Sequence, residues 1–297
     1  MGGKVAFILV LVASVALGAC TAVRLSYNHA DDILRFMASD YFDLDDRQLD
    51  AFRTRVSHFH DWHRANELPR YVDLLSSAGG RVSKGLKPGD VEWATQALRS
   101  RYRFLAARAA EEAAPILATL QPDQIAALEK KLEKNNTKYA KEWLSGDSRK
   151  RERRLLERTT ERFEQWTGNL NASQRRRIED FVRAHPKVME IRFAERRRWQ
   201  ADAVQLLKRH KNPAELAPRL AKLFNEPEAG RSQEYLSENR RWEADLAQLV
   251  LDLDRTLSSE QRERVLRRMN RYAEDFRALA GARSSVAGET RPGLAGS

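Results

Sequence analysis

The sequence predicts an all-α protein, a bundle of long amphipathic helices that follows an N-terminal signal segment. Apolar side chains recur at helical spacing through almost every long stretch. No stretch sustains the period of two that a half-buried strand shows, and Asn-Gly and Asp-Gly hairpin turns are absent from the sequence. A 13-residue run of uncharged, mostly apolar residues, Val5 to Leu17, precedes the first of these helical stretches.

This apolar run is too short for a membrane-spanning helix, which needs roughly 20 such residues, but suits the apolar region of a secretory signal. It ends in Leu17-Gly18-Ala19-Cys20, which resembles the bacterial lipobox. The resemblance implies a lipoprotein signal peptide at residues 1–19, cleavage before Cys20, and acyl chains on Cys20 that anchor the protein in a lipid bilayer. The alternative is an ordinary signal peptide that contains a cysteine.

Cys20 is the only cysteine of the chain. Once lipidated, it leaves no thiol for a disulfide, a cysteine zinc site or a cysteine nucleophile. Thr21 follows it, whereas in the resembled lipoproteins an aspartate at this place tends to retain the protein at the inner membrane. The resemblance therefore implies an outer-membrane lipid anchor in the cell envelope, facing the periplasm.

The helices are marked in chain order by apolar seams and by breaks. The seams comprise Tyr102, Leu105, Ala109, Ile116 and Leu120; Leu128, Leu132, Tyr139 and Trp143; Tyr235, Trp242, Leu246, Leu249 and Leu253; and Val265, Met269, Tyr272, Phe276 and Leu279. The expected breaks lie at 78–90, 145–147, Pro186, 211–213 and 225–227. We expect a helical bundle domain at 20–280, with a sub-boundary near 145–147, and a disordered tail at 281–297.

A five-residue box recurs four times. Its copies are Leu44-Asp45-Asp46-Arg47-Gln48, Leu120-Gln121-Pro122-Asp123-Gln124, Leu170-Asn171-Ala172-Ser173-Gln174 and Leu257-Ser258-Ser259-Glu260-Gln261. This spacing is typical of a capping box, in which an Asp, Asn or Ser accepts from free helix N–H groups and the glutamine reaches back to the cap's own N–H. The site residues that we expect to act this way are Asp45, Gln48, Gln124, Asn171, Gln174, Ser258 and Gln261. Gln121 is a poor capping residue, although Pro122 suits the first turn.

The boxes also resemble the LTxxQ motif of the Spy/CpxP periplasmic chaperones, which are small helical cradles for unfolded clients. None of the four copies has threonine at the second position. The alternative interpretation is four capped helix starts with no role in client binding.

A wider resemblance lies at the start of the mature chain. Its residues are Val23-Arg24-Leu25, Tyr27-Asn28, Ala30-Asp31, Tyr41-Phe42-Asp43-Leu44, Trp62-His63 and Glu67-Leu68-Pro69-Arg70-Tyr71. They are similar to a family of Gram-negative outer-membrane lipoproteins of unknown function. The resemblance implies a lipidated helical envelope protein and transfers no catalytic residue.

Charge is distributed unevenly along the chain. The formal net charge is +11; residues 147–200 hold 16 Lys or Arg against 9 Asp or Glu, and residues 21–75 hold 7 against 10. Such a basic face could attract an anionic envelope component, and nucleic acid is not expected outside the cytoplasm. The alternative is a set of solvated arginine-rich helix faces.

Candidates for other chemistry are few. His58, His60, Asp61 and His63 are the densest group of metal-type ligands, but they lack the i, i+4 histidine pair of a helical zinc site. Acidic pairs such as Asp31-Asp32 are expected in a chain with 42 acids. We therefore expect no metal, no cofactor and no enzymatic activity.

Six tryptophans lie in helical stretches, and two of them, Trp166 and Trp199, lie in the arginine-rich region, where either core packing or stacking on arginine is expected.

The predicted function is a lipid-anchored periplasmic helical binding protein, chaperone-like or related to envelope stress, with unfolded proteins as clients. The alternative is a structural lipoprotein that tethers the outer membrane to an anionic partner.

Overall fold

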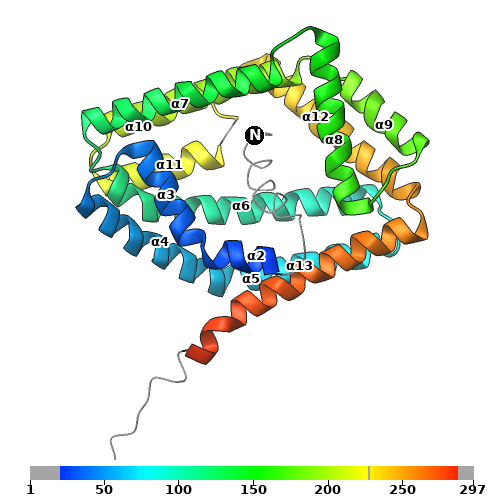
Figure 1. Ribbon diagram of the computed structural model, residues 1–297, viewed down its shortest axis with the longest axis horizontal. Coiled ribbons are helices and arrows are strands. Elements are labelled where there is room, and N and C mark those ends of the chain that lie inside the picture. The colour runs from blue at the N-terminus through cyan, green and yellow to red at the C-terminus, as the bar shows by residue number, and fades with distance from the viewer. Residues whose placement is uncertain (1–20, 227, 287–297) are drawn as a thin grey trace, which may run out of the picture.

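A computed structural model describes residues 21–226 and 228–286, and within these residues the regular elements are all α-helices (Figure 1). Their bounds are α2 Thr21–Asn28, α3 Ala30–Phe42, α4 Asp46–Asn66, α5 Leu68–Val82, α6 Pro88–Leu117, α7 Pro122–Trp143, α8 Ser148–Thr167, α9 Ala172–Arg183, α10 Val188–Arg209, α11 Pro213–Asn225, α12 Gln233–Arg255 and α13 Ser259–Val286. The all-α prediction is confirmed. None of the helices in this described part of the chain is long and apolar enough to cross a membrane.

Two four-helix units of the same topology make up most of the molecule. In the first unit, the packed hairpin α3–α4 meets the consecutive helices α6 and α7 through contacts of α3 with α7 and of α4 with α6. In the second unit, the packed hairpin α8–α9 meets the consecutive helices α12 and α13 through contacts of α8 with α13 and of α9 with α12. Helices α3, α4, α6 and α7 therefore correspond to α8, α9, α12 and α13.

The two units are interlocked, because each is followed by a helix that packs on the other unit in an equivalent way. Helix α5 follows α4 of the first unit and packs along α13 of the second, while α10 follows α9 of the second unit and packs along α7 of the first. Figure 1 shows α7 with α10 along one edge and α5 with α13 along the opposite edge. The equivalent helices α6 and α12 contact each other between these edges. Helix α11 has no counterpart in the first unit and packs against α6.

Small side chains allow the closest of these helix contacts. Ala106, Ala110, Ala114 and Ala118 form a buried row at four-residue spacing on α6 and its C-terminal cap. Residues of α6, α7, α10 and α11 surround this row in one apolar core. The buried members of that core are Ala110, Ala114, Ala118, Leu120, Ile125, Leu128, Val204, Leu207, Leu216 and Leu220.

A second apolar core lies within the second unit. Its buried members, from α8–α9, α9 and α12, are Leu170, Ile178, Phe181, Val182, Leu249 and Leu253. The second unit thus has a core of its own, whereas the core of the first unit is completed by the crossing helices α10 and α11.

The glycine-rich stretch at 78–90 is a shorter break than the sequence predicts. Gly79 and Gly80 lie inside α5, and the chain leaves the helix only after Val82. A Cβ at Gly79 would lie 3.9 Å from Leu266 of α13. That distance is an ordinary van der Waals contact, so these two glycines are simply helical residues, and the true turn is at Gly85, where φ is +80°.

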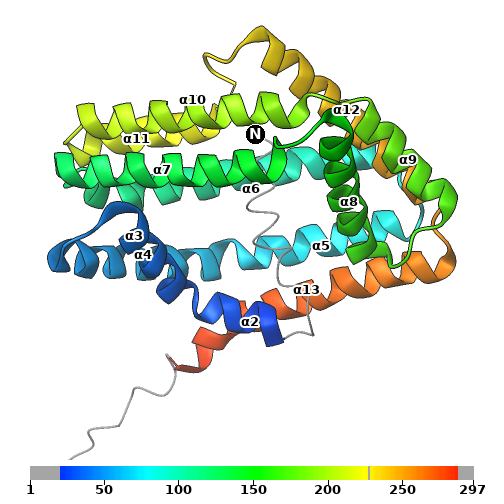
Figure 2. The same ribbon diagram turned by 45° about the horizontal axis from the view of Figure 1, so that its top comes forward.

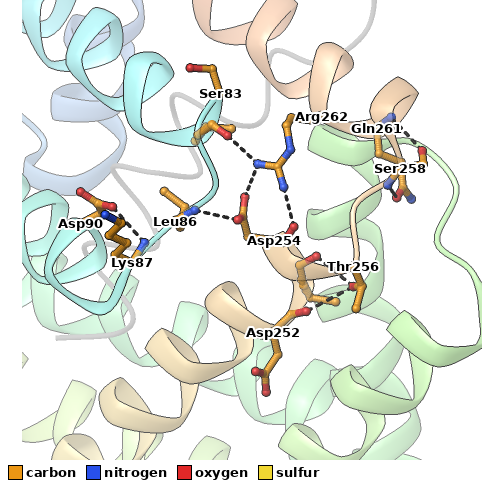
Figure 3. A network of polar contacts seen from close by, with 12 residues as sticks. Ser83, Leu86, Lys87, Asp90, Asp252, Asp254, Thr256, Ser258, Gln261 and Arg262 are labelled. Carbon is orange, nitrogen blue, oxygen red and sulfur yellow. Dashed lines mark hydrogen bonds and ion pairs between the residues drawn. The ribbon is translucent and has the colours of Figure 1, made fainter.

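A polar clamp joins the α5–α6 turn to the α12–α13 turn (Figure 3). The buried carboxylate of Asp254 accepts from Leu86 N at 2.8 Å and from Arg262 Nη1 at 2.7 Å. Arg262 also donates to the carbonyl oxygens of Val82 and Asp254. The bonds to Leu86 N and Val82 O join the two turns, and because Asp254 and Arg262 form a buried ion pair, loss of either side chain leaves an uncompensated charge.

Two other boundaries differ from the expected ones. Helix α13 continues to Val286, beyond the expected start of the tail at 281, and residues 287–297 lie outside the described residues. Pro186 lies in the turn before α10 rather than in its first helical turn. The segment at 145–147 does separate α7 from α8, and Asp147 caps α8 by accepting from Lys150 N at 2.8 Å.

Candidate functional site

The four boxes start α4, α7, α9 and α13, and the expected capping bonds are present. Asp45, Asn171 and Ser258 each accept from the backbone N–H three residues later, at 2.8, 2.9 and 3.1 Å. In all four boxes the glutamine Oε1 accepts from the cap's own N–H at 3.0 Å. Gln121 is the poor cap that the sequence predicts, since its side chain turns away to donate to Thr119 O.

The capping glutamines also meet in pairs, which the sequence analysis did not foresee. In the first unit, Gln48 Nε2 donates to Gln124 Oε1 at 3.1 Å, and Gln124 Nε2 donates to Gln48 Oε1 at 2.7 Å. Each amide also donates to a backbone carbonyl that precedes the partner's box: Gln48 to Thr119 O and Gln124 to Asp43 O.

The second unit repeats this arrangement. Gln174 and Gln261 donate to each other's Oε1 at 3.0 and 3.1 Å. Gln174 Nε2 also donates to Thr256 O, and Gln261 Nε2 to Asn169 O, again two residues before the partner's cap. The equivalence extends to Thr119 and Thr256, whose hydroxyls both donate to the carbonyl three residues earlier.

This geometry gives the box glutamines an architectural role. Each amide oxygen accepts two hydrogen bonds and each amide nitrogen donates at least two. All donors and acceptors of these side chains are therefore used, and none is left to bind a ligand. Gln174 is fully buried, and Gln48 and Gln124 are each 7% exposed. The boxes therefore join helix starts rather than line a surface.

The arginines of residues 147–200 are largely occupied by partners within the fold. Arg151 pairs with Glu190, Arg175 with Glu164, and Arg197 with Glu133. The guanidinium of Arg192 lies 4.3 Å from the centre of the Trp242 ring, and burial lowers its pKa. The segment that the sequence marks as basic is thus partly compensated by neighbouring carboxylates and rings.

A separate group of arginines stands on one face of α13. Arg264, Arg267, Arg268 and Arg271 follow the i, i+3, i+4, i+7 spacing of a single helix stripe. Together with Gln165 near the end of α8 they line a hollow of 260 Å³, which we call the arginine groove. No acidic residue lines it.

The end of α8 fixes the geometry of the arginine groove. Arg268 donates to Gln165 O, and its guanidinium lies 5.2 Å from the Trp166 ring centre. Gly168 ends α8 with φ +78°, and a Cβ there would come within 3.2 Å of the Arg264 side chain. Arg267 pairs with Glu263, outside the lining, at 3.0 Å. Among the described residues, no ion pair engages Arg264 or Arg271.

The histidine group does not assemble a metal site. His60 Nδ1 lies 2.9 Å from Asp31, whereas His63 Nδ1 lies 2.9 Å from the Tyr27 hydroxyl. Burial lowers the pKa of His63 to about 4. Within the described residues, no three His, Cys, Asp or Glu side chains gather as a metal site would require. The acidic pair Asp31-Asp32 is divided, because Asp31 faces His60 and Asp32 faces Arg35.

A buried histidine that the sequence analysis passed over lies in the turn after α9. His185 is fully buried, with Nδ1 3.0 Å from Glu238 and Nε2 3.1 Å from Asp245. Its ring packs on Phe181 and Trp242. It ties the α9–α10 turn to α12, and no sequence pattern marks it, because its partners lie more than fifty residues away.

Of the two tryptophans in the arginine-rich region, Trp166 lies under Arg268, and Trp199 packs against Phe224. One therefore stacks on arginine and the other packs against an aromatic ring, so both expected alternatives occur.

Residues 1–20, with the predicted signal peptide and Cys20, lie outside the described residues.

The fold and the site define an all-α protein of two interlocked helix-hairpin units with an arginine-lined groove. A family model, the family of unknown function DUF6279, matches residues 40–236, about two thirds of the chain. The chain therefore belongs to this family. The match includes the first three boxes but not the resembling residues at 23–31, and the lipoprotein character and the Spy/CpxP likeness remain predictions. No curated protein and no solved structure matches the chain.

Proposed function

We propose that the protein is a lipid-anchored helical binding protein of the cell envelope that faces the periplasm and binds an anionic partner through the arginine groove, without catalysis. The observation that supports this proposal is the convergence of Arg264, Arg267, Arg268 and Arg271 on a 260 Å³ hollow with no acidic lining residue.

Arginine is suited to this task. Its planar guanidinium presents paired N–H donors that match the oxygens of phosphate and carboxylate groups, and it stays charged at any physiological pH. The arginine groove is open to solvent, since Arg264, Arg267 and Arg271 are exposed. Binding there should weaken with salt, because exposed charges are screened beyond about 8 Å at physiological ionic strength.

A substitution of three arginines tests the groove. The variant Arg264→Gln/Arg267→Gln/Arg271→Gln keeps Arg268, which packs on Trp166. The matched control, Arg149→Gln/Arg153→Gln/Arg176→Gln, removes the same charge from exposed positions on α8 and α9. Titration calorimetry of the full chain with polyphosphate should show a large loss of affinity for the first variant alone. Equal losses in both would contradict a defined site.

The lipid anchor has its own test. If Leu17-Gly18-Ala19-Cys20 is a lipobox, the mature protein begins at Cys20 and carries acyl chains, and Cys20→Ser leaves an unlipidated precursor. Mass spectrometry of the protein purified from envelopes measures both. An unmodified Cys20 thiol, or cleavage at another bond, would refute the anchor.

A second candidate function, chaperone-like binding of unfolded clients, is favoured by a different surface. A groove of 460 Å³ between α6 and α12 is lined by both polar and apolar side chains, among them Val91, Ala244 and Leu251. Leu98 and Phe104, also on α6, are 41% and 57% exposed. Apolar contacts of this kind persist in salt, whereas anion binding does not.

Light scattering of a denatured client distinguishes the two candidate functions. A chaperone should suppress aggregation at low salt and still do so, to a lesser extent, at roughly 0.5 M salt, where the Debye length is a few ångströms. Suppression that disappears with salt would favour the anionic partner. Absence of suppression at either salt would exclude the chaperone function.

A further inference from the structure

The position of α2 on α13 determines where a lipid anchor would leave the fold. Arg24 Nε lies 2.7 Å from Asp275 Oδ1, and Arg64 bridges Asn28 Oδ1 and Leu279 O at 3.4 and 3.0 Å. Moving four residues along α2, from Arg24 to Asn28, therefore moves the contact four residues along α13, from Asp275 to Leu279. The two helices therefore run side by side in the same direction, as Figure 2 shows.

This register places the start of α2 beside the arginine groove. Thr21 precedes Arg24 by three residues and so lies level with Tyr272, next to Arg271. The arginines from Arg264 to Arg271 extend over about 10 Å at 1.5 Å per residue. Since Cys20 is bonded to Thr21, acyl chains on Cys20 would leave the protein at the end of this row.

Among the described residues, helices α2 and α3 carry most of the large apolar side chains that are exposed. Leu25 on α2, and Ile33 and Phe36 on α3, are 56%, 46% and 73% exposed. Large apolar side chains next to a lipid anchor suit the boundary between headgroups and acyl chains. Asp32 and Arg35, also on α3, are both exposed and offset each other's charge, so the arginines of α13 are the larger source of attraction to an anionic surface.

From this arrangement we infer that the anionic partner is the phosphate of lipid headgroups in the same leaflet that holds the Cys20 anchor. The inference rests on the proposed function, because it names the ligand of the arginine groove and uses its anchor. The acyl chains, Leu25, Phe36 and the arginine row then contact one bilayer surface. The protein lies along its own membrane instead of reaching to a distant partner.

The test uses the full lipidated chain in vesicles. Because Cys20 is the only native cysteine and would be alkylated, Glu274→Cys on the exposed side of α13 gives one attachment point for a nitroxide, and Lys130→Cys on α7 gives the control. Vesicles of phosphatidylethanolamine with phosphatidylglycerol are compared with vesicles of phosphatidylcholine. Mixing with protein-free phosphatidylglycerol vesicles, followed by turbidity, measures binding to a second membrane.

We expect the α13 nitroxide to become accessible to lipid-soluble oxygen and protected from a water-soluble nickel chelate in anionic vesicles. This protection should be lost in phosphatidylcholine and in the Arg264/Arg267/Arg271→Gln variant, but not in the Arg149/Arg153/Arg176→Gln control. The α7 nitroxide should stay in water throughout, and vesicles should not cluster. Each arginine near an anionic surface should contribute roughly fivefold to membrane affinity.

Other outcomes separate the two proposals. Arginine-dependent clustering of vesicles with an α13 nitroxide in water would overturn this inference and leave the proposed anion binding intact. A nitroxide that stays in water, without clustering and without polyphosphate binding, would overturn the proposed function as well. Membrane contact that is equal in both lipid mixtures would assign the contact to the acyl chains and overturn the role of the arginines.

Discussion

At the residue scale, the glutamines of the boxes combine two tasks in one side chain. The Oε1 atom of Gln124 accepts from its own helix start and from Gln48, while its Nε2 atom donates to Gln48 and to Asp43 O. A buried amide that loses such a partner leaves donors and acceptors unpaired on the other side. The glutamine pair therefore matters more for stability than the capping bond alone.

The pairing predicts a large coupling energy between Gln48 and Gln124. Gln124→Ala should lower the free energy of unfolding by about 2–3 kcal/mol, since it removes the cap bond and leaves the Gln48 amide unsatisfied. A double-mutant cycle with Gln48→Ala should give a coupling of about 1–2 kcal/mol. Urea unfolding measures both, with the exposed Gln248→Ala as control. Additive losses would contradict the paired geometry.

A second prediction at this scale concerns acid. The pKa of His63 is lowered to about 4 by burial, below its usual value of 6.5, so the unfolded chain binds a proton more readily than the folded one. Burial lowers the pKa of His60 as well. Stability should thus be constant above pH 6.5 and fall as the pH falls from 6.5 to 4, by about 2–3 kcal/mol for His63.

The measurement is the free energy of unfolding of the wild type and of His63→Phe over this range of pH. The variant loses the bond to the Tyr27 hydroxyl and is less stable at pH 7, but its stability should fall less with acid. Parallel curves for the two proteins would show that His63 does not carry the pH dependence.

At the element scale, helix starts are easier to predict than helix ends and turns. The boxes identify the starts of α4, α7, α9 and α13 because capping is local, between residues three apart. The break predicted at 78–90 is too wide, because Gly79 and Gly80 look like turn residues but lie inside α5, where Gly79 faces Leu266 of a helix almost two hundred residues away. Local sequence cannot show such a partner.

The caps can be compared with each other. Asn171→Ala and Ser258→Ala should each lower the free energy of unfolding by about 1 kcal/mol, because each removes an acceptor for a helix N–H. Gln121→Ala should have a smaller effect, since that side chain accepts no helix N–H bond. Urea unfolding of the three variants decides this. Equal effects at all three positions would mean that the boxes do something other than cap.

At the scale of the whole molecule, the sequence predicts the all-α fold class but not which helices pack against each other. Four similar boxes are visible in the sequence, but which box meets which depends on contacts 76 and 87 residues apart. One signal was present in the sequence: a threonine precedes the second and fourth boxes, at 119 and 256, and not the other two. The arginine groove was missed because its arginines lie on α13, outside the segment with the largest local excess of charge.

Interlocking of the two units predicts cooperative unfolding. Helix α5 of the first unit is packed on α13, and α10 is packed on α7, so neither unit can lose its structure without exposing apolar surface of the other. Trp62, Trp93 and Trp143 lie in the first unit and Trp166 and Trp242 in the second, whereas Trp199 lies on α10, which packs on the first unit.

A variant with phenylalanine at Trp62, Trp93, Trp143 and Trp199 would report on the second unit, and one with phenylalanine at Trp166 and Trp242 would report on the first unit and the α10 that packs on it. Fluorescence during urea unfolding should give the same midpoint as circular dichroism within each variant. Fluorescence midpoints that depart from the circular-dichroism midpoint in opposite directions in the two variants would show that the units unfold independently.

The glutamine pair has a consequence for how such a fold can arise. Its two halves make the same bonds to each other, which is the isologous contact that relates the subunits of a symmetric homodimer. A single helix hairpin with one box is thus complementary to a copy of itself. Two rounds of duplication and fusion of such a self-pairing hairpin would give four boxes in two pairs. The chain thus resembles a symmetric oligomer joined into one polypeptide, and its two interfaces differ in sequence: Asp254 and Arg262 pair in one unit, where Leu117 and Ile125 occupy the equivalent positions in the other.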